Sequence, residues 1–133
     1  MRYNSFKIYY PLILFFLFVS YGFAQKKIGA LEGKKVLIVY GGWQGHEPNI
    51  FAKKIEKWLL KQKAEVTLSE GTAIYTNAKV MKDLDLIIQH ITMGEITLQE
   101  SKGLIKAIAG GVGLAGCHGG LGDSFRENTE YQY

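Results

Sequence analysis

Residues 35–48 read KVLIVYGGWQGHEP and join three features in one short stretch: a buried-strand pattern, a glycine-rich loop and a helix start. The continuous apolar run over 36–40 is rich in β-branched residues and is typical of a strand buried on both faces of a parallel sheet. Pro48 suits the first turn of a helix, which we expect to run to residue 63. The apolar stripe of this helix should face the sheet and comprises Phe51, Ile55, Trp58 and Leu59.

The same alternation of strand, loop and helix continues along the chain. Further strands are predicted over 65–68, 84–89 and 112–117, and a capping box at Thr97 opens a helix that ends near Ala109. Strands that alternate with helices indicate a parallel sheet with right-handed crossovers. The predicted fold class is therefore α/β, with a doubly wound, mostly parallel, flavodoxin-like sheet. Because no strand follows the last helical segment, we also expect the domain to be incomplete at its C-terminus.

Residues 1–24 have the three parts of a secretory signal peptide. Arg2 and Lys7 supply a positive region, residues 8–19 form an apolar core, and small residues precede the bond between Ala24 and Gln25. Cleavage at that bond predicts an exported protein, periplasmic or extracellular. The alternative is an uncleaved anchor, and the membrane is then contacted through this segment alone.

The rest of the chain divides into a polar lead-in over 25–34 and an α/β domain over 35–133. Without Arg2 and Lys7 the formal charge falls from +4 to +2, and the lysines are scattered over predicted helix faces. Nucleic-acid binding needs clustered basic residues, so we expect no nucleic-acid partner. The single cysteine, Cys117, excludes an internal disulfide, and the core alone must hold the domain together.

All three histidines follow predicted strands, in the loops after the first, third and fourth. Ligands bind at the carboxyl ends of the strands in open parallel sheets, so we expect His46, His90 and His118 to meet at one rim. Imidazoles there indicate acid–base chemistry, or a shared divalent metal such as Zn²⁺ with all three as ligands. The plainer alternatives are a helix-capping His46 and a core histidine at position 90 whose hydrogen bonds are satisfied within the protein.

Other residues of these loops are candidates for substrate binding. Trp43 is suited to stacking on a sugar ring, and its alternative role is to cover the end of the sheet. Glycine loops allow the backbone to approach a ligand closely, and an acidic residue near His118 offers a hydrogen-bond acceptor. The substrate-binding candidates are Trp43, Gly42, Gly119, Gly120 and Asp123.

Cys117 stands at a predicted sharp turn between a strand and a helix, where nucleophile elbows expose a thiolate. The run over 115–119 looks like the elbow of the glutamine-amidotransferase-like superfamily. Cys117 with His118 would then form the catalytic pair of a hydrolase or amidase. The opposing interpretation is a buried, unreactive thiol, since an exposed one outside the cytoplasm is open to oxidation.

Three stretches together resemble the trehalose-utilisation (ThuA-like) family: residues 35–46, residues 110–120 and Asp123-Ser124-Phe125-Arg126. The resemblance implies a class I glutamine-amidotransferase-like fold and a role in carbohydrate utilisation, often beside sugar oxidoreductases. It implies no settled reaction. The recurring glycine-flanked histidine of the family carries over to His118, and the histidine of its first loop to His46. Cys117 occupies a slot that is usually bulky and apolar in the family, which weakens the nucleophile interpretation.

These observations leave three functional hypotheses. The first is an exported sugar-processing enzyme (a hydrolase, lyase or isomerase) whose His46 and His118 act on a hydroxyl or carbonyl of trehalose or a related disaccharide, directly or through a metal. The second is a saccharide-binding module without chemistry, centred on Trp43. The third is the hydrolase or amidase that uses Cys117 and His118.

Overall fold

The computed structural model of the chain describes residues 31–132, and the signal segment expected over 1–24 lies outside them. Strands and helices alternate as the sequence pattern predicts. The strands are β1 (Lys35–Gly42), β2 (Glu65–Glu70), β3 (Leu86–Thr92) and β4 (Gly113–Gly116). The α-helices are α2 (Pro48–Lys61), α3 (Ala78–Lys82), α4 (Leu98–Ala109) and α5 (Thr129–Gln132). Short 3-10 helices are η2 (Gln44–His46), η3 (Ala73–Thr76) and η4 (His118–Gly120).

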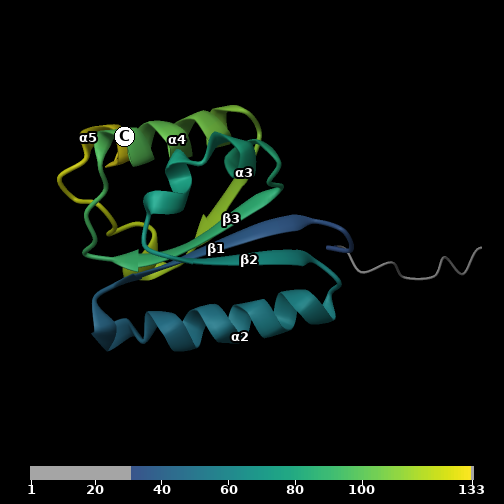
Figure 1. Ribbon diagram of the computed structural model, residues 1–133. Helices are drawn as coiled ribbons and strands as arrows, with labels where there is room; N and C mark the ends of the chain where they lie inside the picture. The colour runs from purple at the N-terminus through teal and green to yellow at the C-terminus, as the bar shows by residue number, and fades with distance from the viewer. Residues whose placement is uncertain (1–30, 133) are drawn as a thin grey trace, which may run out of the picture.

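The four described strands form one parallel sheet in the order β2-β1-β3-β4. Helix α2 covers one face, and α3 and α4 cover the other (Figure 1). Each crossover therefore returns to the sheet through a covering helix, as parallel pairing requires. The predicted flavodoxin-like, doubly wound class is confirmed.

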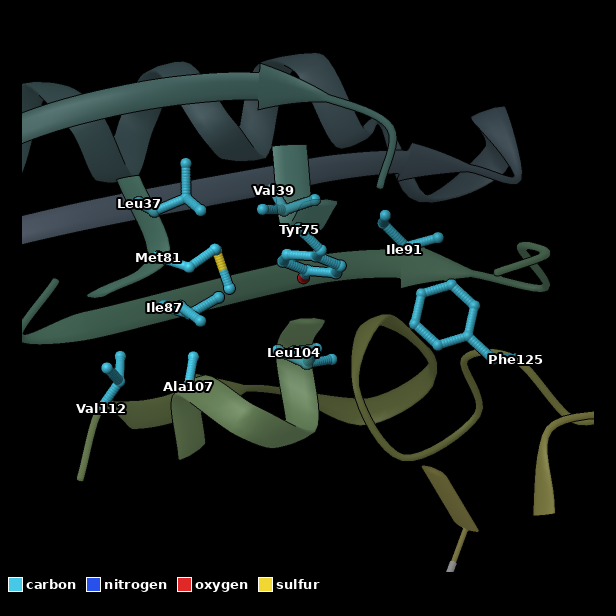
Figure 2. Close-up of a cluster of buried hydrophobic side chains, with 10 residues drawn as sticks. All are labelled: Leu37, Val39, Tyr75, Met81, Ile87, Ile91, Leu104, Ala107, Val112 and Phe125. Carbon is cyan, nitrogen blue, oxygen red and sulfur yellow. The ribbon is translucent and has the colours of Figure 1, made fainter. Parts of the chain in front are cut away.

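Alternate residues of β1 serve the two sides of the sheet. Val36 and Ile38 pack toward α2 with Ala52 and Leu59, whereas Leu37 and Val39 join a larger cluster beneath α4. Figure 2 shows this larger cluster, in which Leu104 of α4 and Phe125 of the segment between η4 and α5 approach the strand side chains. Burial on both faces explains why the β1 sequence is a continuous apolar run.

The stripe predicted for α2 is wrong at one position. Trp58 is 52% exposed, and the residues that α2 buries most completely are Ala52 and Leu59. A small residue at the contact lets the helix approach β1 closely, so the face that meets the sheet is rotated away from Trp58. Trp58 is therefore a surface residue in the part of the chain described here.

A buried polar network ties the segment after β4 to β3. Gln89 is fully buried; its amide oxygen accepts from the Tyr75 hydroxyl at 2.8 Å, and its amide nitrogen donates to Tyr131 at 2.7 Å and Ser124 at 3.1 Å. Burial raises the pKa of Tyr75, which keeps its phenol protonated and able to donate. Satisfied networks of this kind hold elements in one arrangement.

Across residues 31–132, no helix has the length and apolarity needed to cross a bilayer.

Candidate functional site

The carboxyl ends of β1, β3 and β4 lie along one rim of the sheet. Parallel register pairs Gly42 with Thr92 and Gln89 with Gly116, so the loops that follow β1 and β4 emerge on either side of the end of β3. Helix η2 lies in the first of these loops and η4 in the second. The ring centroid of His46 is 6.2 Å from that of His90 and 5.6 Å from that of His118. The expected meeting of the three imidazoles at one rim is confirmed.

His90 differs from expectation in its place on the chain and in its surroundings. It lies inside β3, two residues before the strand ends, and is 6% exposed. The Phe51 ring stacks on it at 4.1 Å between centroids, and its Nε2 donates to the backbone carbonyl of His46 at 3.3 Å. Its Nδ1 is buried without a hydrogen-bond partner among the described residues. The plainer alternative, a satisfied core histidine, is therefore right about burial and holds for only one of the two ring nitrogens. His90 packs beneath the loop that carries His46 and supports it.

His46 is half-buried and lies between His90 and the solvent. Its side chain is held through Nδ1, which is 2.8 Å from Oγ1 of Thr92, and the Trp43 ring meets it edge-on with 4.8 Å between centroids. Thr92 ends β3, is 3% exposed and was not among the candidates from the sequence. The backbone carbonyl of Thr92 also accepts from the Trp43 amide at 2.9 Å. Thr92 therefore holds both the loop and the imidazole of His46.

His118 is the exposed imidazole of the rim. It begins η4 with φ of 48°, a left-handed conformation that histidine tolerates better than most residues. Among residues 31–132, hydrogen bonds to imidazole nitrogens involve only His46 and His90. The ring of His118 is thus open to a ligand on both nitrogens.

The thiol of Cys117 is exposed, and its backbone is extended, with φ of −144°. The left-handed position of the turn belongs to His118, one residue later than the elbow interpretation requires for a nucleophilic cysteine. The buried-thiol alternative is wrong, because the side chain reaches solvent. At this turn the left-handed residue that a nucleophile elbow would expose is His118, and His118 is exposed to solvent.

Asp123 makes a two-pronged ion pair with Arg126, with contacts of 2.5 and 2.6 Å. The Arg126 guanidinium holds the pKa of Asp123 below its usual range, and the positive form of His118 adds to the shift. The carboxylate oxygens of Asp123 are already engaged by Arg126, and its role in substrate binding stays a prediction.

The glycines of the rim allow close approach of backbone to side chain. A Cβ on Gly120 would overlap Nδ1 of His90, and one on Gly119 would come within 2.9 Å of Cγ2 of Thr92. A Cβ on Gly42, whose φ is 74°, would overlap the backbone of Thr92. Gly119 and Gly120 are buried, so packing η4 against the histidines is their visible role, and ligand contact by these glycines stays a prediction.

The fold does not assemble the three-histidine metal site. Between residues 31 and 132, no three His, Cys, Asp or Glu side chains are placed to hold one ion. The reason is that His90 directs Nε2 at a carbonyl and keeps Nδ1 buried, while Nδ1 of His46 is bonded to Thr92. The expectation of Zn²⁺ shared by His46, His90 and His118 is corrected accordingly.

Two cavities of about 750 and 490 Å³ lie against α4, and their walls contain no histidine. They are lined mostly by apolar side chains, whereas the groups able to move a proton stand at the rim. Chemistry therefore favours the rim over the larger hollows as the functional site.

A protein-family model described as ThuA, trehalose utilisation, matches residues 35–133. This range includes the rim and all three histidines. Comparisons with curated proteins and with solved structures gave no match.

Proposed function

Because the chain belongs to the ThuA family of trehalose utilisation, we propose that it processes trehalose or a related disaccharide at a hydroxyl or carbonyl group, and that His46 and His118 carry out the chemistry. The protein works after export, directed by the signal segment over 1–24. Its partner is a small carbohydrate, which sugar oxidoreductases of the same pathway supply or consume.

The observation that carries this proposal is the separation of 5.6 Å between the ring centroids of His46 and His118. A sugar hydroxyl or carbonyl oxygen that lies beside two imidazoles at that separation can come within hydrogen-bond reach of a nitrogen of each ring. Neutral imidazole can donate through one ring nitrogen and accept through the other. The pair therefore provides a proton donor and a proton acceptor at the edge of the sheet where ligands bind in this fold class.

Trp43 supports a sugar as the substrate. Its side chain is 53% exposed although it contacts His46 edge-on, so part of the indole surface is available beside the imidazole pair. Aromatic rings present a flat apolar face with a polar handle, which suits the apolar faces and hydroxyl edges of saccharides. A sugar stacked on Trp43 would place its hydroxyl groups next to His46.

Turnover by His118→Asn tests the catalytic proposal. Asparagine tolerates the left-handed backbone of position 118, so this change removes the imidazole with the least strain. Incubation of the full chain with trehalose and with its oxidised keto form should yield product that the variant does not make. Cys117→Ala, at the neighbouring exposed position, is the matched control and should keep turnover. Wild-type rates in His118→Asn, or loss of turnover in Cys117→Ala, would transfer the chemistry away from the imidazole pair.

The exposed indole of Trp43 also favours the second candidate, a saccharide-binding module without chemistry. Calorimetry separates the two, because binding of trehalose or its keto form without product describes a module. Trp43→Ala should weaken binding by about tenfold or more if the indole stacks on the sugar. Trp58→Ala is the matched control: Trp58 is 52% exposed, on α2, and should leave the affinity unchanged.

A further inference from the structure

We propose that Thr92 holds His46 in the tautomer that carries its hydrogen on Nε2, so that His46 meets the ligand as a hydrogen-bond donor and His118 alone acts as the base. This division of roles rests on the proposed function of the imidazole pair. Thr92 is a positioning residue in this account, because it acts through His46 and does not touch the substrate.

The Thr92 hydroxyl is buried. Thr92 is 3% exposed at the end of β3, and its side chain is pressed between His46 and Gly119. The main-chain bond from the Trp43 amide to the Thr92 carbonyl fixes the strand end against the loop that carries His46. The hydroxyl therefore has little access to water and must find its partner within the protein.

The burial of Thr92 decides which group donates in its hydrogen bond with His46. Within the described residues, the hydrogen-bond partner of Thr92 Oγ1 is Nδ1 of His46, at 2.8 Å. If Nδ1 carried the hydrogen, it would donate to Oγ1, and the buried hydroxyl hydrogen would have no acceptor. If Oγ1 donates to Nδ1, the buried hydroxyl hydrogen has an acceptor, which is the arrangement of lower free energy. In neutral His46 the hydrogen is then on Nε2.

The imidazole ring of His46 is also held in position by its own backbone. The backbone carbonyl of His46 accepts from Nε2 of His90, and this bond restrains the loop from beneath. His90 must itself carry its hydrogen on Nε2, because a carbonyl can only accept. With its backbone and Nδ1 both held, His46 has Nε2–H left for a ligand.

The consequence is a division of labour between the two imidazoles. Nε2–H of His46 can donate to a sugar carbonyl or hydroxyl oxygen, where it would stabilise developing negative charge. His118 is exposed, and its ring is not committed to a protein partner among residues 31–132, so it is the imidazole free to accept a proton. Sugar hydroxyl protons would therefore pass to His118.

Nitrogen NMR of the ligand-free full chain tests this proposal without any substrate. With ¹⁵N-labelled histidine, at a pH where the imidazoles are neutral, the protonated and unprotonated ring nitrogens are distinguished by their chemical shifts and ring couplings. We expect His46 to carry its hydrogen on Nε2 with roughly tenfold or greater preference over the other tautomer. Thr92→Val, of similar shape without the hydroxyl, should reduce that preference several-fold, and Thr92→Ser should restore it.

The resonances of His90 serve as the internal control, since its Nε2–H bond to the His46 carbonyl does not depend on the Thr92 hydroxyl. Hydrogen on Nδ1 of His46 in the wild type would overturn the proposal. So would a tautomer ratio in Thr92→Val equal to that of the wild type, with His90 unchanged. Because no sugar is present, these results are independent of turnover: loss of the proposed function would show in the His118→Asn assay, and loss of this inference would show here.

Discussion

Nε2 of His90 lies 3.3 Å from the backbone carbonyl of His46 and links the middle of the sheet to the loop that carries the site. The two residues come from different strand–loop units. His90 therefore controls where His46 stands, although its own ring is shielded from solvent by Phe51 and Gly120.

Two replacements of His90 should separate the contribution of its hydrogen bond from that of its ring packing. His90→Leu removes the donor to the His46 carbonyl and should lower the free energy of unfolding by about 1–3 kcal/mol. His90→Gln can offer an amide N–H near the former Nε2 position and should lose less. Urea unfolding followed by fluorescence measures both variants. An equal loss in the two would mean that the hydrogen bond contributes nothing and that ring packing explains the whole effect.

The close approach of η4 to β3 predicts a contrast between two neighbouring glycines. Gly120→Ala should destabilise the protein by about 1–3 kcal/mol, because the new methyl would overlap the imidazole of His90. Gly122→Ala is the matched control, since its methyl would meet only the His118 carbonyl, at 3.6 Å. Thermal unfolding of the pair checks this. Comparable midpoints for the two variants would contradict the packing described for the rim.

The buried amide of Gln89 predicts coupling with Tyr75. Gln89→Leu leaves the Tyr75 hydroxyl without its acceptor and should cost about 1–3 kcal/mol of folding free energy. Tyr75→Phe in the same background removes the stranded hydroxyl. A double-mutant cycle should therefore show less than additive loss, with an interaction energy of about 0.5–3 kcal/mol. Strict additivity would show that the 2.8 Å contact has no energetic weight.

The ion pair of Asp123 with Arg126 predicts a pH dependence of known sign. Folding lowers the pKa of Asp123, so the pair stabilises the folded state above the ordinary Asp pKa of about 3.9 and is lost as the pH falls through the lowered value. Arg126→Gln should return the Asp123 pKa toward about 3.9. Carboxyl-carbon NMR titration measures the shift. The same pKa in both proteins would contradict the pairing.

The fold was readable from the sequence because its strongest signals are local. The run over 36–40 requires burial on both faces, and Thr97 and Glu100 form the predicted capping box that starts α4. The helix face of α2 was less readable: bulk favours Trp58 as a contact residue, whereas close packing against β1 selects the small Ala52. Size at a helix–sheet contact depends on the interaxial distance, which periodicity alone does not reveal.

The sequence predicted which histidines meet at the candidate site, but it did not predict the role of each one. The strand–loop pattern placed three histidines at one rim, and the geometry confirms this. The predicted third strand ended at Gln89, however. In the structure the β-branched Ile91 and Thr92 continue β3, so His90 is part of the strand and is buried. Thr92 and His46 are far apart in sequence, so their hydrogen bond has no local spacing signal. One available clue was the β-branched character of Thr92, which favours extending β3.

The proposed function requires that a disaccharide binds over the His46–His118 pair beside Trp43. The most direct measurement is a ¹⁵N NMR titration of the full chain with trehalose and, separately, with its keto form. We predict saturable shifts of the His46 and His118 imidazoles and of the Trp43 indole, with the Trp58 indole unmoved. Shifts at Trp58 or along α4 with silent imidazoles, for both sugars, would contradict the account.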